Sequence, residues 1–430
     1  MTDYWWPDLE VLNQEDRETA AIAQLRDRID DAVRSSAFYR AKYESAGVTS
    51  RDVRDRATLA DLPVVTKEEL IEDQAMAPPY GSILGCAVEE LVRLYVGPGP
   101  QAAYFTADDL AAAVERGAWV FFTHGFRRTD IVDVTAMYHW VAAGTLLDAS
   151  YRRIGCATIP GGAGMAETHI ANLRWTGATG LFAFPSFLER MAEAATVAGV
   201  DLVNDLRLRV CSIAGEISSP SHKARMEAAW GGMAVREQYG CSEVASVAAE
   251  CGQSAGMHLA PGVFVEVLEP ETRRPVPDGD PGVMVLTDLS RKASPAIRFW
   301  TGDMTGGLIS EACPCGRAMP RMRQIVGRVS DIVRVKGRFI VPKQVASALR
   351  TVSGIGPARL IIERPGAQDV ITVAVERGNS ELHDEVLRSA VVAALKTGIG
   401  LGCDVNIVKS GEVGGETVVI DDRRAVERAS

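Results

Sequence analysis

Hydrophobic and polar positions along the chain follow two periods, which predict helices and strands in turn. Between residues 9 and 47, apolar residues recur every three to five positions, as they do on one face of an amphipathic helix. From residue 107 onward, helical stretches alternate with short apolar runs at residues 131–138, 155–162, 208–215 and the start of 180–191. Strands that alternate with helices predict a doubly wound α/β sheet, with the functional site at the strand ends.

The pattern changes after Gly327 and predicts a second, smaller α/β unit. Apolar runs typical of strands cover residues 332–337, 358–365, 369–378 and 403–409, and helical spacing covers residues 341–352 and 380–398. A chain of 430 residues is also too long for one ordinary core. We therefore expect a large N-terminal doubly wound domain over residues 1–329 and a small, mobile C-terminal α/β domain over residues 330–430.

Composition narrows the functional classes. The net charge of −10, with no basic run, argues against a nucleic-acid partner. The chain begins without a basic stretch followed by an apolar one, so no signal peptide is expected, and no apolar run is long enough for a membrane span. Eight cysteines in such a chain favour a reducing cytoplasm over a disulfide framework.

The most informative stretch is Tyr239-Gly240-Cys241-Ser242-Glu243, which follows a predicted strand. On its own this stretch is also typical of an ordinary strand-to-loop corner. Together with Glu216 upstream and Thr301-Gly302-Asp303 downstream, it predicts a pocket for a planar polar ligand. An aromatic ring would offer a stacking face, and carboxylates would offer hydrogen-bond acceptors.

A second group of residues has the composition of a metal site. Cys313 and Cys315 lie in a Gly/Pro-containing turn, and Cys251 and His258 lie close together further upstream. Three thiolates and one imidazole would close a tetrahedral zinc site of the structural kind, because no coordination position would stay open. The alternative is a set of separate buried thiols with a surface histidine.

Six motifs in order make the chain resemble the phenylacetate–CoA ligase branch of the adenylate-forming acyl-CoA ligase superfamily. They are AGE at 214–216, YGCSE at 239–243, PAIRFWTGD at 295–303, CPCGR at 313–317, GRVSD at 327–331 and VKGRFIVP at 335–342. The resemblance covers nearly the whole chain, and it implies the fold more strongly than the reaction, because one fold hosts many activities.

The resemblance also implies roles for single residues. Nucleotide and CoA binding falls on Gly215, Glu216, Tyr239, Gly240 and Ser242, with Asp303 accepting hydrogen bonds from a ribose and Arg328 reaching the ribose or phosphate. An acyl pocket that suits an aromatic carboxylate falls on Tyr138, Trp140, Phe184, Pro185 and Ala214, although these aromatic residues are equally consistent with a core. Relatives in this branch carry a Cys/His metal knot, and the resemblance is compatible with a homodimer.

Two departures from the family pattern concern ATP. The loop at residues 93–106 stands where the family has a Ser/Thr/Gly-rich phosphate loop ending in Lys-Pro, but it has two Gly and two Pro and no Ser or Lys. Near the C-terminus, Gly415 and Thr417 occupy the region of the family's catalytic Lys, and the nearest lysine is Lys409. That lysine stabilises charge during adenylation, an effect of about 3–4 kcal/mol in comparable sites.

These departures lead to the hypothesis that the protein transfers an aryl-acyl group between CoA and a carrier-protein thiol without efficient adenylation. Its candidate catalytic residues are Glu243, His139 and Cys241, although a lone histidine near a strand end is more often structural. The reaction would use a CoA thioester and an acyl carrier protein. The alternatives are an ATP-dependent, AMP-forming aryl-acid–CoA ligase that needs ATP and Mg²⁺, with phosphate contacts from Arg338, Lys336 or Arg236, and a binding or scaffold subunit without catalysis.

Overall fold

The computed structural model describes residues 4–97, 101–331, 333–335, 338–340, 342–364, 369–379, 382–400, 402–414 and 418–424. Two compact units divide the chain. The larger comprises Met1–Thr301 and Thr305–Ile325, and the smaller comprises Gly302–Met304 and Val326–Ser430. The predicted domain boundary at residues 329 and 330 stays a prediction, and each unit is described by itself below.

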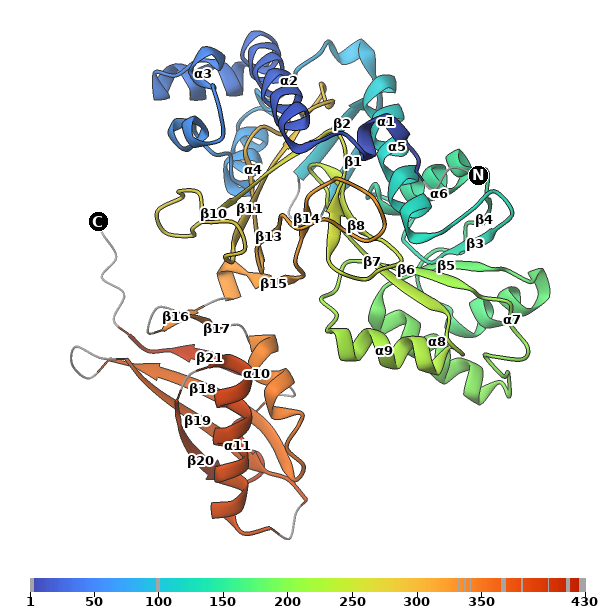
Figure 1. Ribbon diagram of the computed structural model, residues 1–430, viewed down its shortest axis with the longest axis vertical. Helices are drawn as coiled ribbons and strands as arrows, with labels where there is room; N and C mark the ends of the chain where they lie inside the picture. The colour runs from blue at the N-terminus through green and yellow to red at the C-terminus, as the bar shows by residue number, and fades with distance from the viewer. Residues whose placement is uncertain are drawn as a thin grey trace. The chain divides into compact units, whose positions relative to one another are not determined.

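A nine-stranded sheet with the order β13-β14-β9-β8-β7-β6-β5-β3-β4 forms the centre of the larger unit (Figure 1). The five strands from β7 to β4 are mutually parallel, whereas β7, β8, β9, β14 and β13 pair antiparallel. The strand bounds are β3 Ile131–Val134, β4 Ala157–Ile159, β5 Gly180–Ala183, β6 Val210–Ile213, β7 Ala234–Cys241, β8 Ala245–Glu250, β9 Met257–Leu259, β13 Leu308–Ile309 and β14 Arg321–Met322. The parallel part is the predicted doubly wound sheet.

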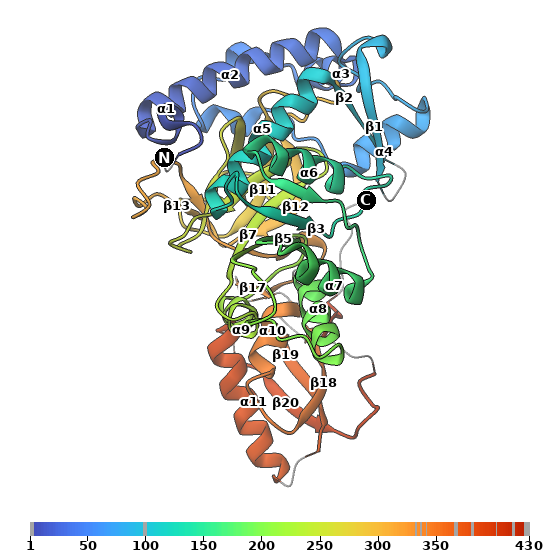
Figure 2. The ribbon, with the colours of Figure 1, turned by 90° about the vertical axis from the view of Figure 1, so that its right-hand side faces the viewer.

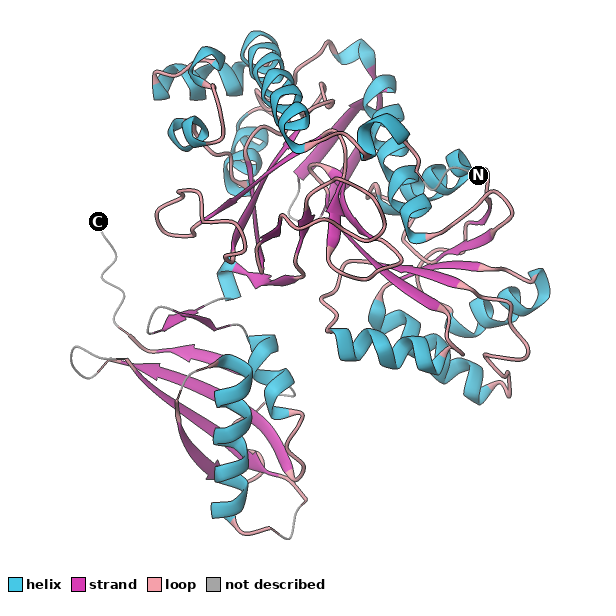
Figure 3. Cartoon of the chain, viewed as in Figure 1, coloured by secondary structure: helices cyan, strands magenta, loops and turns pink. Residues whose placement is uncertain are grey.

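Helices cover both faces of the parallel strands because their residues alternate between two cores (Figure 3). In β5, Leu181 and Ala183 pack with α7, α8 and α9, whereas Phe182 packs with α5 and α6 on the opposite face. The helix bounds are α5 Ala107–His124, α6 Ala143–Ile154, α7 Ala166–Thr176, α8 Pro185–Val197 and α9 Pro220–Ala229. This two-sided covering confirms the α/β class.

Local chemistry explains where these helices begin. The Thr106 side chain accepts a hydrogen bond from the Asp109 amide, and the Asp109 carboxylate accepts one from the Thr106 amide, which forms a capping box on α5. Thr66 and Glu69 make the same exchange at the start of α4. Such caps satisfy amide groups that would otherwise lack partners at a helix N-terminus.

The N-terminal helices pack on a second, four-stranded sheet with the order β10-β11-β12-β15. A two-stranded hairpin of β1 and β2 stands beside the site described below. The bounds are α1 Pro7–Glu10, α2 Gln14–Ser35, α3 Ala37–Ala46, α4 Lys67–Met76, β1 Leu91–Gly97, β2 Gln101–Thr106, β10 Val263–Leu268, β11 Gly282–Asp288, β12 Phe299–Thr305 and β15 Ile325–Arg328. Buried side chains of α2, α3, β10 and β11 share one hydrophobic core.

The smaller unit has its own hydrophobic core beneath a four-stranded sheet with the order β20-β19-β18-β21. Helix α11 lies along this sheet in both views (Figure 1 and Figure 2). The bounds are β16 Val333–Val335, β17 Arg338–Ile340, α10 Pro342–Leu349, β18 Ile355–Glu363, β19 Val370–Arg377, α11 Asp384–Ile399, β20 Asp404–Val408 and β21 Val419–Asp422. Among the described residues of both units, no helix is long and apolar enough to cross a membrane.

Candidate functional site

A cavity of about 690 Å³ opens at the carboxyl ends of β5, β6 and β7 in the larger unit. Parallel sheets place ligand sites at this edge. Its walls are mainly apolar, and the side chains that give it this character include Val141, Leu146, Leu147, Phe182, Phe184 and Phe299. The cavity therefore suits a ligand with a sizeable apolar part.

Several residues singled out from the sequence line this cavity together. Residues 240–243 form one wall: Gly240 and Cys241 end β7, and Ser242 and Glu243 follow it directly. Ala214 and Gly215 follow β6, and Phe184 follows β5. The structure thus brings three predicted segments, far apart in the sequence, into one site.

The predicted segment 138–140 lies outside the cavity wall, which continues instead from Val141 to Ala143. Tyr138 is half-buried and its hydroxyl lies 3.5 Å from the Asp148 carboxylate. Burial, together with that carboxylate, raises the pKa of Tyr138 well above its usual range. Trp140 is 75% exposed in a left-handed backbone conformation, with φ of 69°.

Three other predicted residues also lie away from the cavity wall. Tyr239 is only 9% exposed and packs into the hydrophobic core beneath β7 and β8, so its ring does not offer an open stacking face. The Glu216 carboxylate accepts hydrogen bonds from the amide and hydroxyl of Ser186, at 2.9 and 2.5 Å. It therefore caps the first turn of α8, next to Pro185.

Polar side chains that the sequence did not reveal also contribute to the cavity. Gln74 in α4 exchanges two hydrogen bonds of 2.8 Å with the backbone of Ala102, and so fixes β2 beside the cavity. Arg291 is 3% exposed, lines the cavity and lies four residues before the PAIRFWTGD motif. Burial lowers the pKa of Arg291. Its position next to a motif was the one sequence signal that could have pointed to it.

Glu243 gives the cavity wall its negative charge. Its Oε1 atom is buried and has no hydrogen-bond partner in the described part of the chain. A buried carboxylate oxygen without a donor is costly unless a ligand supplies one. This atom is therefore suited to a cation or a hydrogen-bond donor of a bound substrate.

The residues predicted for the nucleotide ribose meet each other in the smaller unit. Arg328 Nε donates a hydrogen bond of 3.0 Å to Asp303 Oδ1, and the Arg328 side chain is largely exposed. Of the alternative phosphate contacts, Arg236 bonds Glu227 at 3.1 Å. Residues 98–100, Lys336, Gly415 and Thr417 lie outside the described residues, as does the side chain of Arg338.

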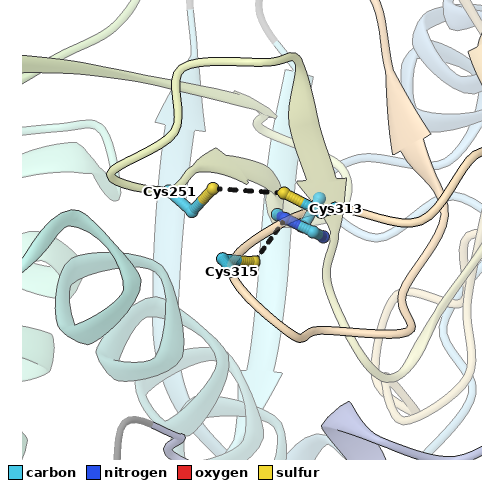
Figure 4. A group of neighbouring side chains, drawn as sticks. Cys251, Cys313 and Cys315 are labelled. Carbon is cyan, nitrogen blue, oxygen red and sulfur yellow. Dashed lines mark hydrogen bonds between the residues drawn. The ribbon is translucent and has the colours of Figure 1, made fainter.

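The four predicted metal ligands come together in the larger unit, and Figure 4 labels the three cysteines among them. Their ligand atoms all lie within 4.8 Å of one another, with the Sγ atoms of Cys251 and Cys313 3.7 Å apart and Cys315 Sγ 3.3 Å from His258 Nε2. His258 Nδ1 lies 3.3 Å from the Met319 carbonyl oxygen, so a proton on Nδ1 leaves Nε2 as the ligand atom.

The protonation states fit a metal ligand set. Burial lowers the pKa of His258 to about 4, so the imidazole is neutral near pH 7, which is the form that binds metal. Burial raises the pKa of Cys251 to about 12. A divalent cation would reverse that effect, because metal binding deprotonates a thiol. The set of three thiols and one imidazole, closely spaced and buried, fits structural zinc.

The loop with Cys315 also holds the N-terminal segment, defined here as residues 4–12. Arg317 Nε donates to the fully buried Glu10 carboxylate at 2.5 Å, and the Ala318 amide donates to the Glu10 carbonyl at 2.7 Å. The Tyr4 hydroxyl lies 3.4 Å from the Cys315 carbonyl oxygen. Order in this loop and order in the N-terminal segment are therefore connected.

Comparisons with known proteins agree with this architecture. The profile of the AMP-binding enzyme family matches residues 100–288, and the profile of the AMP-binding enzyme C-terminal domain matches residues 337–423. The phenylacetate-coenzyme A ligase of Thermus thermophilus is 27% identical over 94% of this chain and 95% of its own. That of Pseudomonas putida is 28% identical over 92% of each chain.

The chain belongs to the phenylacetate–CoA ligase branch of the adenylate-forming acyl-CoA ligase superfamily. A solved structure of similar shape is the open conformation of 2-hydroxyisobutyryl-CoA ligase in complex with 2-HIB-AMP and CoA. Its TM-score is 0.87 at 27% identity, over 98% of this chain and 95% of that chain. The same ligase in its postadenylation state gives a TM-score of 0.82 at 28% identity. The similarity to these enzymes therefore extends over both units of the chain.

Proposed function

We propose that the protein is an ATP-dependent, AMP-forming ligase that joins an apolar carboxylic acid, most suitably an aromatic one, to CoA. The observation that carries this proposal is the cavity at the carboxyl ends of β5, β6 and β7, which combines an apolar wall with the unpartnered Glu243 carboxylate oxygen. Relatives that match over more than nine-tenths of the chain are named as acid–CoA ligases, which supports the same reaction.

The apolar wall determines the acyl group. Phe182, Phe184 and Phe299 surround the space that the acid would enter. Aromatic side chains favour stacked or edge-to-face contact with a bound ring, so an arylacetate or a benzoate suits the cavity. Binding would remove the apolar part of the acid from water at about 25 cal/mol per Å².

Glu243 provides the polar end of the site. A divalent cation bridges the phosphates of ATP in phosphoryl and nucleotidyl transfer and offsets their charge. The buried oxygen of Glu243 that lacks a partner fits a ligand to that cation, since hard cations prefer carboxylate oxygens. Asp303 and Arg328, which hydrogen-bond each other, would contact the ribose and phosphate of the nucleotide.

In the proposed reaction, an oxygen of the substrate carboxylate attacks the α-phosphorus of ATP and pyrophosphate leaves. The thiol of CoA then loses its proton to solvent, its sulfur attacks the acyl carbon of the acyl-adenylate, and AMP leaves with the bonding electron pair. Both steps develop negative charge on phosphate oxygens, which a cation held by Glu243 would offset.

Acyl transfer between CoA and a carrier-protein thiol remains the second candidate. It is favoured by the sequence of residues 93–106, which lacks Ser and Lys and falls largely in the paired strands β1 and β2, and by Gly415 and Thr417 in the place of a catalytic lysine. The relatives support the ligase instead, because they are named for joining an acid to CoA. Cys241 lines the cavity, so the transfer reaction could pass through a thioester with this thiol.

Pyrophosphate release separates the two candidates. Purified protein would receive ATP, Mg²⁺ and phenylacetate or benzoates, with and without CoA, and a parallel sample would receive phenylacetyl-CoA with a holo carrier protein. The ligase predicts acid-dependent pyrophosphate release and CoA-dependent AMP release. Acyl movement to the carrier without pyrophosphate would support the transferase instead, and no turnover in either sample would leave a binding or scaffold role.

We also propose that Cys251, His258, Cys313 and Cys315 hold a structural zinc ion. Its test is metal analysis of protein purified without added metal, which should contain about one zinc per chain. Cys315→Ser should lose this zinc, whereas Cys403→Ser, a half-buried cysteine of the smaller unit, should keep it. Equal zinc content in both variants would contradict the assignment.

A further inference from the structure

Two buried arginines hold three consecutive carbonyl groups of the loop that follows β7. Arg291 Nη1 donates to the carbonyl oxygen of Ser242 at 3.3 Å and to that of Glu243. Arg116 Nη2, from α5, donates to the carbonyl oxygen of Val244 at 2.5 Å. Both guanidinium groups are almost completely inaccessible to water. The backbone on both sides of Glu243 is therefore fixed from two separate elements.

Asp288 at the end of β11 connects the two arginines. Its Oδ2 atom accepts a hydrogen bond of 2.6 Å from Arg116 Nη2, and its Oδ1 atom accepts one of 3.1 Å from the backbone amide of Arg291. A buried carboxylate between two buried cations reduces the cost of keeping both charged in the interior. Arg116, Asp288 and Arg291 form what is called here the loop-holding cluster.

Arg291 also connects this loop with β2. Its guanidinium carbon lies 4.1 Å above the ring of Phe105, and its Nη2 lies 3.5 Å from the Tyr104 carbonyl oxygen. β2 begins at Gln101, and residues 98–100, which precede it in the sequence, occupy the position of the family's phosphate loop. The cluster therefore joins the loop after β7 to β2, and both of these segments border the cavity.

The loop needs such support because its backbone is strained and crowded. Ala245 has a left-handed conformation with φ of 64°, which costs free energy for a residue with a Cβ. A Cβ at Gly240 would lie 2.5 Å from the Ala245 carbonyl oxygen, so the chain closes tightly here. Since Glu243 Oε1 makes no hydrogen bond to the described residues, the backbone sets where this carboxylate lies.

We propose that the loop-holding cluster is a positioning device for Glu243, and that Arg291 is its central residue. The role of Glu243 in catalysis rests on the proposed ligase function, whereas the position of the loop does not. A carboxylate that must meet a cation or substrate at a fixed point loses efficiency when its backbone shifts, and a shift of about 1 Å can reduce turnover roughly 100-fold.

The test compares Arg291→Met and Arg291→Lys with Arg321→Met. Arg321 is a matched control, because it is also a buried arginine that donates to two carbonyl oxygens, those of Ala255 and Glu311, but it does not line the cavity. Arg291→Met should lower kcat for acid-dependent pyrophosphate release by about 100-fold. The KM for the acid should stay within about threefold, and Arg291→Lys should recover part of kcat. If Arg291 had a merely structural role, kcat would fall alike in Arg291→Met and Arg321→Met, in proportion to their loss of thermal stability.

The position of the loop is measured separately through Cys241, the last residue of β7, which directly precedes the loop. Alkylation by iodoacetamide, followed by mass spectrometry of the Cys241 peptide, should become several-fold faster in Arg291→Met, while Cys403 in the smaller unit should react at an unchanged rate. Unchanged Cys241 labelling and unchanged kcat would overturn the proposal. If the wild-type protein releases no pyrophosphate, the ligase function fails, and Cys241 labelling alone decides whether Arg291 holds the loop.

Discussion

Gly215 offers a direct test that the cavity binds the acyl group. It follows β6 with φ of 81°, and a Cβ at this position would lie 2.6 and 2.8 Å from two ring carbons of Phe184. The Phe184 ring would have to retreat by about 0.8 Å to reach ordinary contact at 3.4 Å. Because Phe184 lines the cavity, Gly215→Ala moves an aromatic wall while leaving the polar residues in place.

The expected effect has two parts. An alanine in a left-handed conformation costs about 1–2 kcal/mol of folding stability. Displacing the ring that orients the acid adds a kinetic effect, since a misplacement near 1 Å can cost roughly 100-fold in rate. At 1.36 kcal/mol per tenfold, this corresponds to about 2.7 kcal/mol of lost transition-state stabilisation. Steady-state kinetics with phenylacetate should show it in kcat/KM for the acid, with little change in KM for ATP.

Gly199→Ala is the matched control for backbone strain. Gly199 has φ of 65° after α8, and a Cβ there would meet nothing within 4 Å. It should lose similar thermal stability and keep kcat/KM. Adding Phe184→Leu to Gly215→Ala should restore part of the activity. Equal kinetics in the two alanine variants, or no recovery in the double variant, would refute the placement of the acyl group.

Three further predictions concern stability. Burial opposes a charge on His169, but its 2.6 Å hydrogen bond with Asp133 and the charge of that carboxylate raise the pKa of His169 above 6.5. The His169–Asp133 pair therefore stabilises the fold fully below pH 6.5, and this stabilisation is lost as pH rises through the pKa of the folded state. Urea unfolding at several pH values should show that loss, and His169→Gln should remove the pH dependence. Glu266→Gln should reduce the free energy of unfolding by about 3–5 kcal/mol, because the buried Arg298 would lose its bidentate partner. Cys315→Ser should speed amide exchange in the N-terminal segment, measured by mass spectrometry, because that segment is hydrogen-bonded to the loop that contains Cys315 and Arg317.

Each of these predictions has a result that would count against it. A pH profile unchanged by His169→Gln would show that the pair is energetically silent. If Glu266→Leu combined with Arg298→Met is no more stable than Glu266→Gln, the cost does not come from an unpaired charge. If amide exchange in the N-terminal segment is equally fast in Cys315→Ser and Cys403→Ser, the order of that segment does not depend on the loop that contains Cys315.

Local patterns were sufficient to predict much of the fold. Apolar spacing between residues 9 and 47 predicted helix, and α2 and α3 cover most of that range. The apolar run at residues 208–215 became β6, in the centre of the parallel sheet. The run at 131–138 was too long, because β3 ends at Val134 and the following residues turn away into the loop that contains Trp140. Apolar character alone does not mark where strand pairing stops.

The polar architecture of the site was less accessible. Motif order brought out Glu243 and Gly215, which both line the cavity, and the spacing of Cys313 and Cys315 brought out the metal cluster. Arg291 and Gln74 act through contacts with segments more than 25 residues away, so no local period marks them. Such side chains become visible only when the fold places their partners beside them.

Acid-dependent release of pyrophosphate is the most direct test of the proposed function. Purified protein with ATP and Mg²⁺ should release pyrophosphate when phenylacetate or a related aromatic acid is present, and CoA should then increase AMP release. Release that needs the acid would establish adenylation despite the unusual sequence at residues 93–106 and the missing C-terminal lysine. No pyrophosphate with any acid, together with acyl movement from phenylacetyl-CoA to a carrier thiol, would contradict the ligase and establish the transferase.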